Sequence, residues 1–497
     1  MTRLLTLVLL ALPVLHGCGM VPLYSHANRE SEQTTIPVPR PVENIYRAIS
    51  LRPPLPTSIP SGVEKAALVS VPWQVSAACR TPALMSSLST LPERCRDTRF
   101  VALTISGGGS RASVFSAAVM FELQRYGVLE HVDLLSCVSG GCLTAAYYAL
   151  SCDHPDDPAT CPPTTNGANR YAWDEDTLYP LLERRLLWRW FGNWFWPGNI
   201  LKYWFTYFDR TDIMAATLSN NLFDHSVLDN NQFRFRDLNP ARPNLAINAT
   251  NITAESSQSF HFSFSPEQFR KIHSDLDRYP IANAVMASAS FPGAFNYVTL
   301  RDYSKTEPPR YVHLLDGGAY DNLGLNAIKV AMESSANAGP RQRLVIIVDA
   351  YPAADDLLSR EPEPRGMLDY IIDSNFFAAY DTLLTSLRQT QLGYAKTLLK
   401  SVDGELLHIS WDRFEDDPDR RALYLRLNRI PTSFNIADDD ARCLKHAAQM
   451  LVQTTLDAIV ATPNHPLRAL VKPPKTRSPL AECTLAPAAM TAERAPP

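Results

Sequence analysis

The chain has 497 residues, of which 45% are hydrophobic and 20% charged, and its formal net charge at pH 7 is −4. This composition is typical of a folded globular protein with a sizeable core, and the length allows one large α/β domain with accessory segments or two to three ordinary domains. Nucleic-acid binding usually requires a concentrated basic face, so this composition does not favour a nucleic-acid partner.

The first 17 residues have the pattern of a secretory signal peptide. An apolar run over residues 4–15 follows a positive residue, and it is shorter than the roughly 20 residues that a membrane-spanning helix needs. Residues 15–18 (LHGC) resemble the cleavage site of bacterial lipoproteins, with a histidine in place of a small residue. The resemblance implies that Cys18 carries a lipid anchor, and Gly19 after it implies sorting to the outer membrane of a bacterial cell envelope. An ordinary signal peptide cut elsewhere is the alternative.

Two stretches rich in proline lie outside the predicted fold. Residues 18–60 combine Pro with polar residues and predict an extended tether between the anchor and the fold. Residues 471–497 are rich in Pro and Ala and predict a loosely ordered tail.

Between these stretches, apolar strands alternate with helices. Residues 100–106 predict a strand and residues 112–126 a helix, and residues 132–138 and 140–150 repeat this pair. Such an alternation favours a three-layer α/β fold, in which helices cover both faces of a mostly parallel central sheet. Further strands are predicted at residues 244–250, 311–317, 343–350 and 406–411.

The first strand-to-helix turn is rich in glycine. Gly107, Gly108 and Gly109 expose backbone N–H groups at the positive end of a helix dipole, without a Cβ to obstruct a ligand. Such a turn suits a negatively charged oxygen, either a phosphate or a transient oxyanion. The spacing Gly107-x-Gly109-x-x-Ala112 also fits the dinucleotide-binding fingerprint, so a nucleotide-binding protein is an alternative. However, no acidic residue ends the next strand, where that fingerprint places its ribose-binding carboxylate.

The second turn places a serine between a strand and a helix. Ser139 follows Cys137 and precedes Gly140 and Gly141, which are the small neighbours that a nucleophile elbow requires. The tight turn would hold the hydroxyl out of the sheet and direct the N–H of Gly140 toward an oxyanion. This pattern predicts Ser139 as a nucleophile.

A carboxylate ends a third apolar strand. Asp316 precedes two glycines and is expected at the carboxyl edge of the sheet, where open α/β folds bind their ligands. Together with the other two turns, this position predicts Asp316 as a base. A conventional Ser-Asp-His triad stays open, with Asp316 or Asp349 as the acid and His408 or His446 as the histidine.

Five blocks resemble the patatin-like phospholipase family and follow the family's order. SGGGSRA at 106–112 looks like its oxyanion-hole loop, CVSGG at 137–141 like its GxSxG elbow, and DGG at 316–318 like its Asp-Gly-Gly/Ala motif. Residues 287–295 and 321–324 are similar to two more stretches of the family. The departures from the family pattern are Ala112 and Cys137, and neither removes a functional group.

The resemblance implies a catalytic domain over residues 99–330, with residues 331–470 completing the α/β core. It implies a dyad of Ser139 and Asp316 that hydrolyses carboxylic esters of phospholipids or lysophospholipids, without a metal or an organic cofactor. Arg111 would brace the glycine loop or meet a head-group phosphate. The implied oxyanion donors are the N–H groups of Gly107, Gly108, Gly109 and Gly140.

Export would bring the nine cysteines into an oxidising compartment, where disulfides form. Apart from Cys18 and the two cysteines beside Ser139, six remain, and neighbours in sequence suggest three pairs, although spacing alone leaves the connectivity open. No paired CxxC or close Cys/His cluster supports zinc instead. The suggested pairs are Cys79–Cys95, Cys152–Cys161 and Cys443–Cys483.

Residues 186–208 form a dense aromatic segment that holds five of the eight Trp residues. Aromatic side chains mixed with Arg and Lys are favoured where a membrane meets water. Two interpretations follow: a buried cap over the core, or a lid or membrane-contact surface that admits lipid chains. The sequence does not predict an oligomeric state.

Overall fold

The computed structural model describes residues 28–31, 99–155, 161, 163–164, 169–223, 232–255, 259–305, 307–334, 342–352, 374–401, 404–474 and 479–484. The predicted signal peptide, most of the tether, Cys18 and the suggested Cys79–Cys95 pair lie outside these residues.

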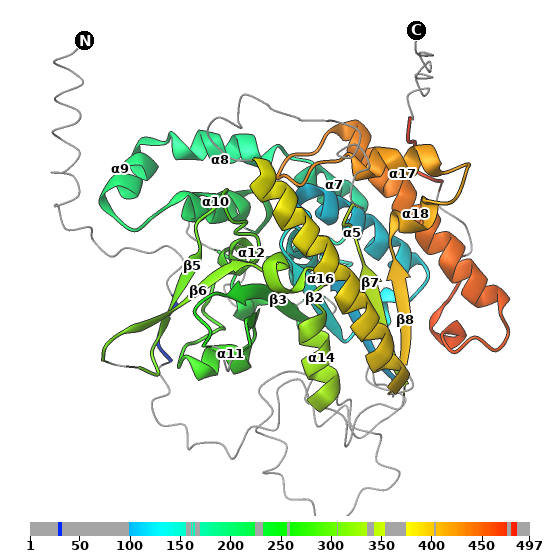
Figure 1. Ribbon diagram of the computed structural model, residues 1–497, viewed down its shortest axis with the longest axis horizontal. Coiled ribbons are helices and arrows are strands. Elements are labelled where there is room, and N and C mark those ends of the chain that lie inside the picture. The colour runs from blue at the N-terminus through cyan, green and yellow to red at the C-terminus, as the bar shows by residue number, and fades with distance from the viewer. Residues whose placement is uncertain are drawn as a thin grey trace, which may run out of the picture.

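One mixed sheet forms the centre of the described part of the chain (Figure 1). Five neighbouring strands are parallel, in the order β3 (Asn244–Asn251), β2 (Leu134–Val138), β1 (Arg99–Ile105), β7 (Gln342–Val348) and β8 (Gly404–Ile409). Three further strands are antiparallel to their neighbours: β4 (His261–Phe264) and β6 (Arg310–Asp316), which both pair with β3, and β5 (Val298–Asp302), which pairs with β6.

The predicted three-layer fold with a mostly parallel sheet is confirmed. Every predicted strand is present, with its ends shifted by one or two residues. The sequence missed the short strands β4 and β5. It also gave no hint that β6 runs antiparallel to β3, which matters for the position of Asp316.

Helices cover both faces of the sheet because the strand side chains alternate between two cores. In β1, Val101, Leu103 and Ile105 belong to one core, and Phe100 and Ala102 to the other. The first core is covered by α5 (Gly109–Arg125), α6 (Gly141–Leu150), α12 (Ile281–Ser288) and α18 (Asp438–Ala461). The second is covered by α14 (Leu325–Ser334) and α16 (Ser374–Ser401), which lie in front of the sheet in Figure 1.

A group of helices follows α6 and lies along the upper part of the view in Figure 1. It consists of α7 (Glu175–Leu182), α8 (Leu186–Trp194), α9 (Pro197–Phe205) and α10 (Arg210–Leu218). The remaining α-helices of the described residues are α11 (Pro266–Lys271), α13 (Gly318–Asp321) and α17 (Arg421–Asn428).

Two of the suggested disulfides, Cys152–Cys161 and Cys443–Cys483, are confirmed. The second fastens part of the predicted loose tail to α18. There the N–H of Ala481 also donates to the side chain of Gln449 at 2.7 Å. Residues 479–484 are therefore tied to the domain, and the expectation of a loose tail is wrong for them.

Candidate active site

The carboxyl ends of β2 and β6 meet beside β3. Val138 of β2 pairs with Asn248, and Asp316 of β6 pairs with Ala249, which is the next residue of β3. Since β2 is parallel to β3 and β6 is antiparallel to it, the two strands run toward each other along β3. This register, rather than a shared edge of parallel strands, brings the residue after β2 close to the last residue of β6.

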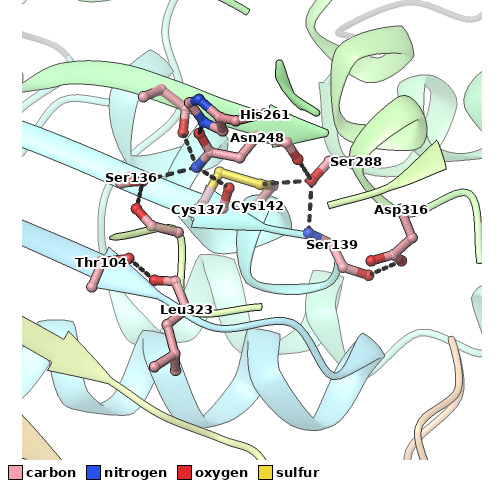
Figure 2. The surroundings of a disulfide bond; sticks show 12 residues. Thr104, Ser136, Cys137, Ser139, Cys142, Asn248, His261, Ser288, Asp316 and Leu323 are labelled. Atoms are coloured by element: carbon pink, nitrogen blue, oxygen red, sulfur yellow. Dashed lines mark hydrogen bonds between the residues drawn. A yellow bond between two sulfur atoms is a disulfide. The ribbon is translucent and has the colours of Figure 1, made fainter. Parts of the chain in front are cut away.

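Ser139 and Asp316 are in direct contact at this junction. The hydroxyl of Ser139 donates a hydrogen bond to Oδ2 of Asp316 at 2.9 Å (Figure 2). Ser139 has a φ of 49°, a conformation that L side chains rarely adopt and that a sharp strand-to-helix turn imposes on its central residue. Both residues are buried. The two residues predicted from separate turns are thus brought together.

Ser288 supports the backbone of the elbow. Its hydroxyl accepts a hydrogen bond from the N–H of Ser139 at 2.8 Å and donates to the carbonyl of Asn248. The side-chain amide of Asn248 donates in turn to the carbonyl of Cys137 at 2.9 Å (Figure 2). Neither residue was predicted from the sequence, although Ser288 falls in a block that resembles the family and Asn248 places a polar side chain within an apolar strand.

A disulfide joins Cys137 to Cys142 across the elbow. Cys137 is near the end of β2 and Cys142 near the start of α6, so the bond links the strand before Ser139 to the helix after it (Figure 2). The sulfur of Cys142 also lies 3.7 Å from the hydroxyl of Ser288. Both cysteines are fully buried. This pair was not among the suggested disulfides, because the sequence analysis treated the two cysteines only as neighbours of the nucleophile.

Burial determines the charge state of Asp316. It raises the pKa of the Asp316 carboxyl to about 6, although hydrogen bonds from the N–H of Gly318 and the hydroxyl of Ser139 act in the opposite direction. The Gly318 bond, 2.7 Å long, holds Oδ1, and the N–H of Asp316 donates to the carbonyl of Ser290 at 3.1 Å. The carboxylate is therefore fixed in place, with a pKa closer to neutrality than that of an exposed Asp.

The glycine loop lies against the elbow, but its N–H groups are not equivalent. The N–H of Gly107 donates to the carbonyl of Asn322 at 3.1 Å, so the expectation that it serves as an oxyanion donor is not met. Within the described residues, the N–H groups of Gly108, Gly109 and Gly140 have no hydrogen-bond acceptor. These three remain available to a ligand oxygen.

The close approach of two turns leaves little space at the start of α5. A Cβ on Gly140 would lie 2.1 Å from the carbonyl oxygen of Gly109, so only glycine fits there. On the other side, the carbonyl of Ser433 accepts the N–H of Ser110 at 2.7 Å. The N–H of Ser110 is therefore not available to a pyrophosphate at this helix terminus, which counts against the nucleotide-binding alternative.

Arg111 braces the glycine loop from beneath. Its guanidinium is buried and donates to the carbonyl of Ala350 at 3.0 Å and to the hydroxyl of Thr432 at 2.9 Å. These contacts tie the start of α5 to the end of β7 and to the segment that carries Ser433. Of the two roles expected for Arg111, the bracing role fits this geometry.

The histidines considered for a triad have other partners. His408 lies 2.9 Å from Asp349, which also accepts a hydrogen bond from Arg388. Burial alone would raise the pKa of Asp349, but these two partners outweigh it and hold the pKa below its ordinary value. His446 is hydrogen-bonded to the carbonyl of Ala481. Among the described residues, no histidine is hydrogen-bonded to Ser139.

In the described ranges, no three His, Cys, Asp or Glu residues are grouped so that they could hold a metal ion.

A comparison with protein families identifies this region. Residues 103–328 match the family model of patatin-like phospholipases. The matched stretch contains the glycine loop, the elbow and Asp316, whereas β7 and β8 lie beyond it and complete the same sheet. The match supports a lipid acyl hydrolase as the general class of activity.

Two solved structures, one human and one bacterial, are among those similar to this chain. Human GIVD cytosolic phospholipase A2 is 13% identical to this chain, with a TM-score of 0.39. The alignment covers 73% of this chain and 59% of the human protein. VipD from Legionella pneumophila is 12% identical to this chain, with a TM-score of 0.23. The alignment covers 73% of this chain and 87% of VipD. The chain thus spans less than two thirds of the human enzyme. Among curated proteins, none matches it significantly.

Proposed function

We propose that this chain is a serine acyl hydrolase that cleaves carboxylic esters of phospholipids or lysophospholipids through a Ser139–Asp316 dyad. The observation that carries the proposal is the 2.9 Å hydrogen bond from the Ser139 hydroxyl to Asp316, made at an elbow of positive φ within the patatin-like phospholipase domain. A second support is the raised pKa of Asp316, of about 6, which makes this carboxylate a stronger base than an ordinary Asp.

Acylation would begin with proton transfer along the existing hydrogen bond. Asp316 takes the hydroxyl proton while Oγ of Ser139 attacks the ester carbonyl carbon. Negative charge then develops on the carbonyl oxygen, and the unpaired N–H groups of Gly108, Gly109 and Gly140 are its proposed donors. Each such donor typically contributes 10²–10³ to turnover. As the tetrahedral intermediate collapses, protonated Asp316 gives its proton to the departing alcohol.

Deacylation would use the same carboxylate. Asp316, again ionised, removes a proton from a water molecule that attacks the acyl-serine carbonyl, and the same N–H groups receive the second oxyanion. Collapse of that intermediate releases the fatty acid and returns the proton to Oγ of Ser139. Every proton therefore passes through Asp316, and the cycle needs no histidine.

The proposal extends to attachment at the cell envelope. A lipid on Cys18, which lies outside the described residues, would hold the enzyme at the outer membrane of a bacterium, and segment 186–208 would contact the lipid surface. Mass spectrometry of the mature N-terminus tests the first part. Acylated Cys18 as the first residue is the expected result, and an unmodified N-terminus elsewhere contradicts it.

A fluorophosphonate probe tests the dyad directly. The wild-type chain should be labelled on Ser139 and should release fatty acid from phosphatidylcholine or lysophosphatidylcholine, whereas Ser139→Ala should do neither. Ser290→Ala is a matched control, because this serine is also buried in the site region but makes no contact with Asp316 through its side chain. Absence of labelling in the wild type, or tight binding of a dinucleotide, would overturn the proposal.

A further inference from the structure

The α8–α9 arm, defined as residues 186–208, is neither fully buried nor evenly exposed. Leu186, Trp190 and Phe208 are buried against the core. By contrast, Trp188 is 66% exposed, Phe195 72%, Trp196 68% and Trp204 55%. The interpretation of this segment as a buried cap is therefore correct for its inner side chains only, and a group of large aromatic side chains faces outward.

Helix α9 is the most exposed part of the arm. Its sequence, PGNILKYWF, is largely apolar, yet none of its nine residues is buried. A soluble protein commonly exposes single apolar side chains, but a contiguous group of this size marks an interaction surface. Within the described residues, nothing covers this group.

The charges on the arm are all of one sign. Within the arm the charged residues are Arg189 and Lys202, and Arg184 and Arg185 directly precede it, although the whole chain has a net charge of −4. The nearest acidic residues in the sequence are Glu183 and Asp209. Arg185, Arg189 and Lys202 are exposed, and none of them forms an ion pair with an acidic residue in the described part of the chain. The outward face thus combines aromatic rings with unneutralised positive charge.

The root of the arm is joined to one wall of the candidate active site. Trp190 packs against Phe295, with ring centroids 5.5 Å apart. Phe295 belongs to the same 287–295 block that accepts the backbone N–H groups of Asp316 and Gly317. The arm therefore begins directly on the segment that positions the base.

A second contact joins the arm to the glycine loop. The N–H of Leu187 donates to the side chain of Asn435 at 3.1 Å, two residues after Ser433, whose carbonyl accepts the N–H of Ser110. In Figure 1 the arm lies at the upper edge of the molecule, the side toward which the arrowhead of β8 points. The arm thus lies at the end of the sheet where the parallel strands finish, which is also the end where Ser139 follows β2.

We propose that the outward face of the α8–α9 arm docks on the surface of an anionic phospholipid bilayer, with its aromatic rings at the membrane–water interface. Trp and Tyr favour this interface, and Arg and Lys on the same element add attraction to anionic head groups. The proposal rests on the proposed function in one respect, which is that a lipid hydrolase must bind the membrane that contains its substrate. Binding to the bilayer itself requires no catalysis.

The other possible occupants fit less well. A symmetric contact between two copies would bring the same exposed cations together, which is unfavourable. Insertion of the arm across the bilayer does not fit either, because α8 and α9 have nine residues each and a spanning helix needs roughly 20. The geometry points to a peripheral contact.

Co-sedimentation with vesicles tests the proposal. The full chain is used with Cys18→Ser and Ser139→Ala, so that neither an attached lipid nor hydrolysis affects binding, on vesicles of phosphatidylcholine with and without phosphatidylglycerol. Removing Trp188, Trp196 and Trp204 together by substitution with Ala should weaken partitioning about tenfold or more. Replacing Arg185, Arg189 and Lys202 with Ser should lower binding to phosphatidylglycerol vesicles about fivefold for each charge, with less effect on pure phosphatidylcholine.

The matched control replaces exposed apolar side chains elsewhere, with Leu383→Ala, Tyr394→Ala and Leu425→Ala together, and it should bind as the parent does. Circular dichroism checks that each variant is folded. Equal sedimentation of the Trp variant and its parent would overturn the proposal. So would a parent dimer, seen by size exclusion, that the Trp variant abolishes without a change in vesicle binding. If the wild type takes no fluorophosphonate but still binds vesicles through these Trp residues, the proposed function fails and the docking surface stands.

Discussion

The nucleophile elbow and the α8–α9 arm both lie toward the carboxyl end of the parallel strands, but they are built in opposite ways. At the elbow, the backbone of Ser139 is held by the Ser288 hydroxyl, by the Cys137–Cys142 disulfide and by strand pairing on both sides. In the arm, the inner side chains are packed, while Trp188, Trp196 and Trp204 are more than half exposed. Chemistry at one carbonyl requires atoms fixed to within a fraction of an ångström, whereas a lipid surface needs only area and charge.

Substitutions at the elbow should therefore alter turnover, whereas substitutions on the arm should alter binding of the protein to a lipid surface. The two effects can be separated with a soluble short-chain ester, which needs the elbow alone, and with lipid vesicles, which need both.

The largest effect is expected from Asp316→Asn. Without a base, turnover of the soluble ester should fall by about 10⁴-fold, as in other hydrolases that lose the carboxylate of their catalytic unit. Steady-state kinetics on the purified variant measures the loss. A variant that keeps a tenth of wild-type turnover would exclude Asp316 as the base.

The same variant should be more stable at pH 8. Because folding raises the pKa of Asp316 from 3.8 to about 6, the folded state binds the proton more tightly than the unfolded state, so stability falls as pH rises through this window. Removing the buried charge should recover up to about 3 kcal/mol at pH 8 and nothing below pH 4. Urea unfolding at both pH values measures the difference, and a variant less stable at pH 8 would contradict the assigned cause.

The second largest effect is expected from opening the elbow disulfide. Cys137→Ala with Cys142→Ala should slow fluorophosphonate labelling of Ser139 by about 10–100-fold, because a displacement of about 1 Å can cost 10²-fold in rate. Cys443→Ala with Cys483→Ala, which opens a disulfide on α18, is the matched control and should lower the melting temperature without slowing labelling. Equal labelling rates in both double variants would mean that the elbow is positioned without its disulfide.

A smaller effect is expected from pH. In the proposed mechanism the ionised form of Asp316 accepts the serine proton, so kcat/KM on the soluble ester should fall as pH drops through about 6, by about tenfold at pH 5. A pH–rate profile with a check of reversibility measures this limb. A flat profile between pH 7 and 5 would show that the base has an ordinary carboxyl pKa or is another group.

The smallest effect on the soluble ester is expected from the arm. Trp196→Ala and Trp204→Ala remove exposed side chains, so the free energy of unfolding should change by no more than about 0.5 kcal/mol, and soluble-ester turnover should be unchanged. Hydrolysis of vesicle lipid should still decrease. Parallel losses on both substrates would mean that the arm acts on the site itself, and the contrast between the two regions would be lost.

Local sequence patterns predicted the parts of this site that depend on a single turn. The turns that carry Ser139 and Asp316 were predicted because a polar side chain between a strand and small residues is visible within a few positions. Gly107 was misjudged because whether its N–H is free depends on the carbonyl of Asn322, more than 200 residues away.

Pairings distant in the sequence could not be predicted. The direction of β6 depends on β3, and nothing within YVHLLDG distinguishes a parallel from an antiparallel strand. Short edge strands such as β4 and β5 carry too few residues for a clear alternation. The Cys137–Cys142 bond required knowing that the chain reverses at Ser139 so tightly that the two Cα atoms come within 5.0 Å.

The Cys137–Cys142 bond also bears on when the candidate active site is assembled. Two thiols must give up two electrons to an oxidant before a disulfide joins the strand to the helix. Thiols in a cytosol that glutathione and thioredoxin keep reduced do not form such a bond. The last step of assembling the nucleophile is then an oxidation rather than a folding event, and a newly made chain would wait for it. Producing the chain in a reducing and in an oxidising cytosol, and comparing the labelled fraction of Ser139, would time that step.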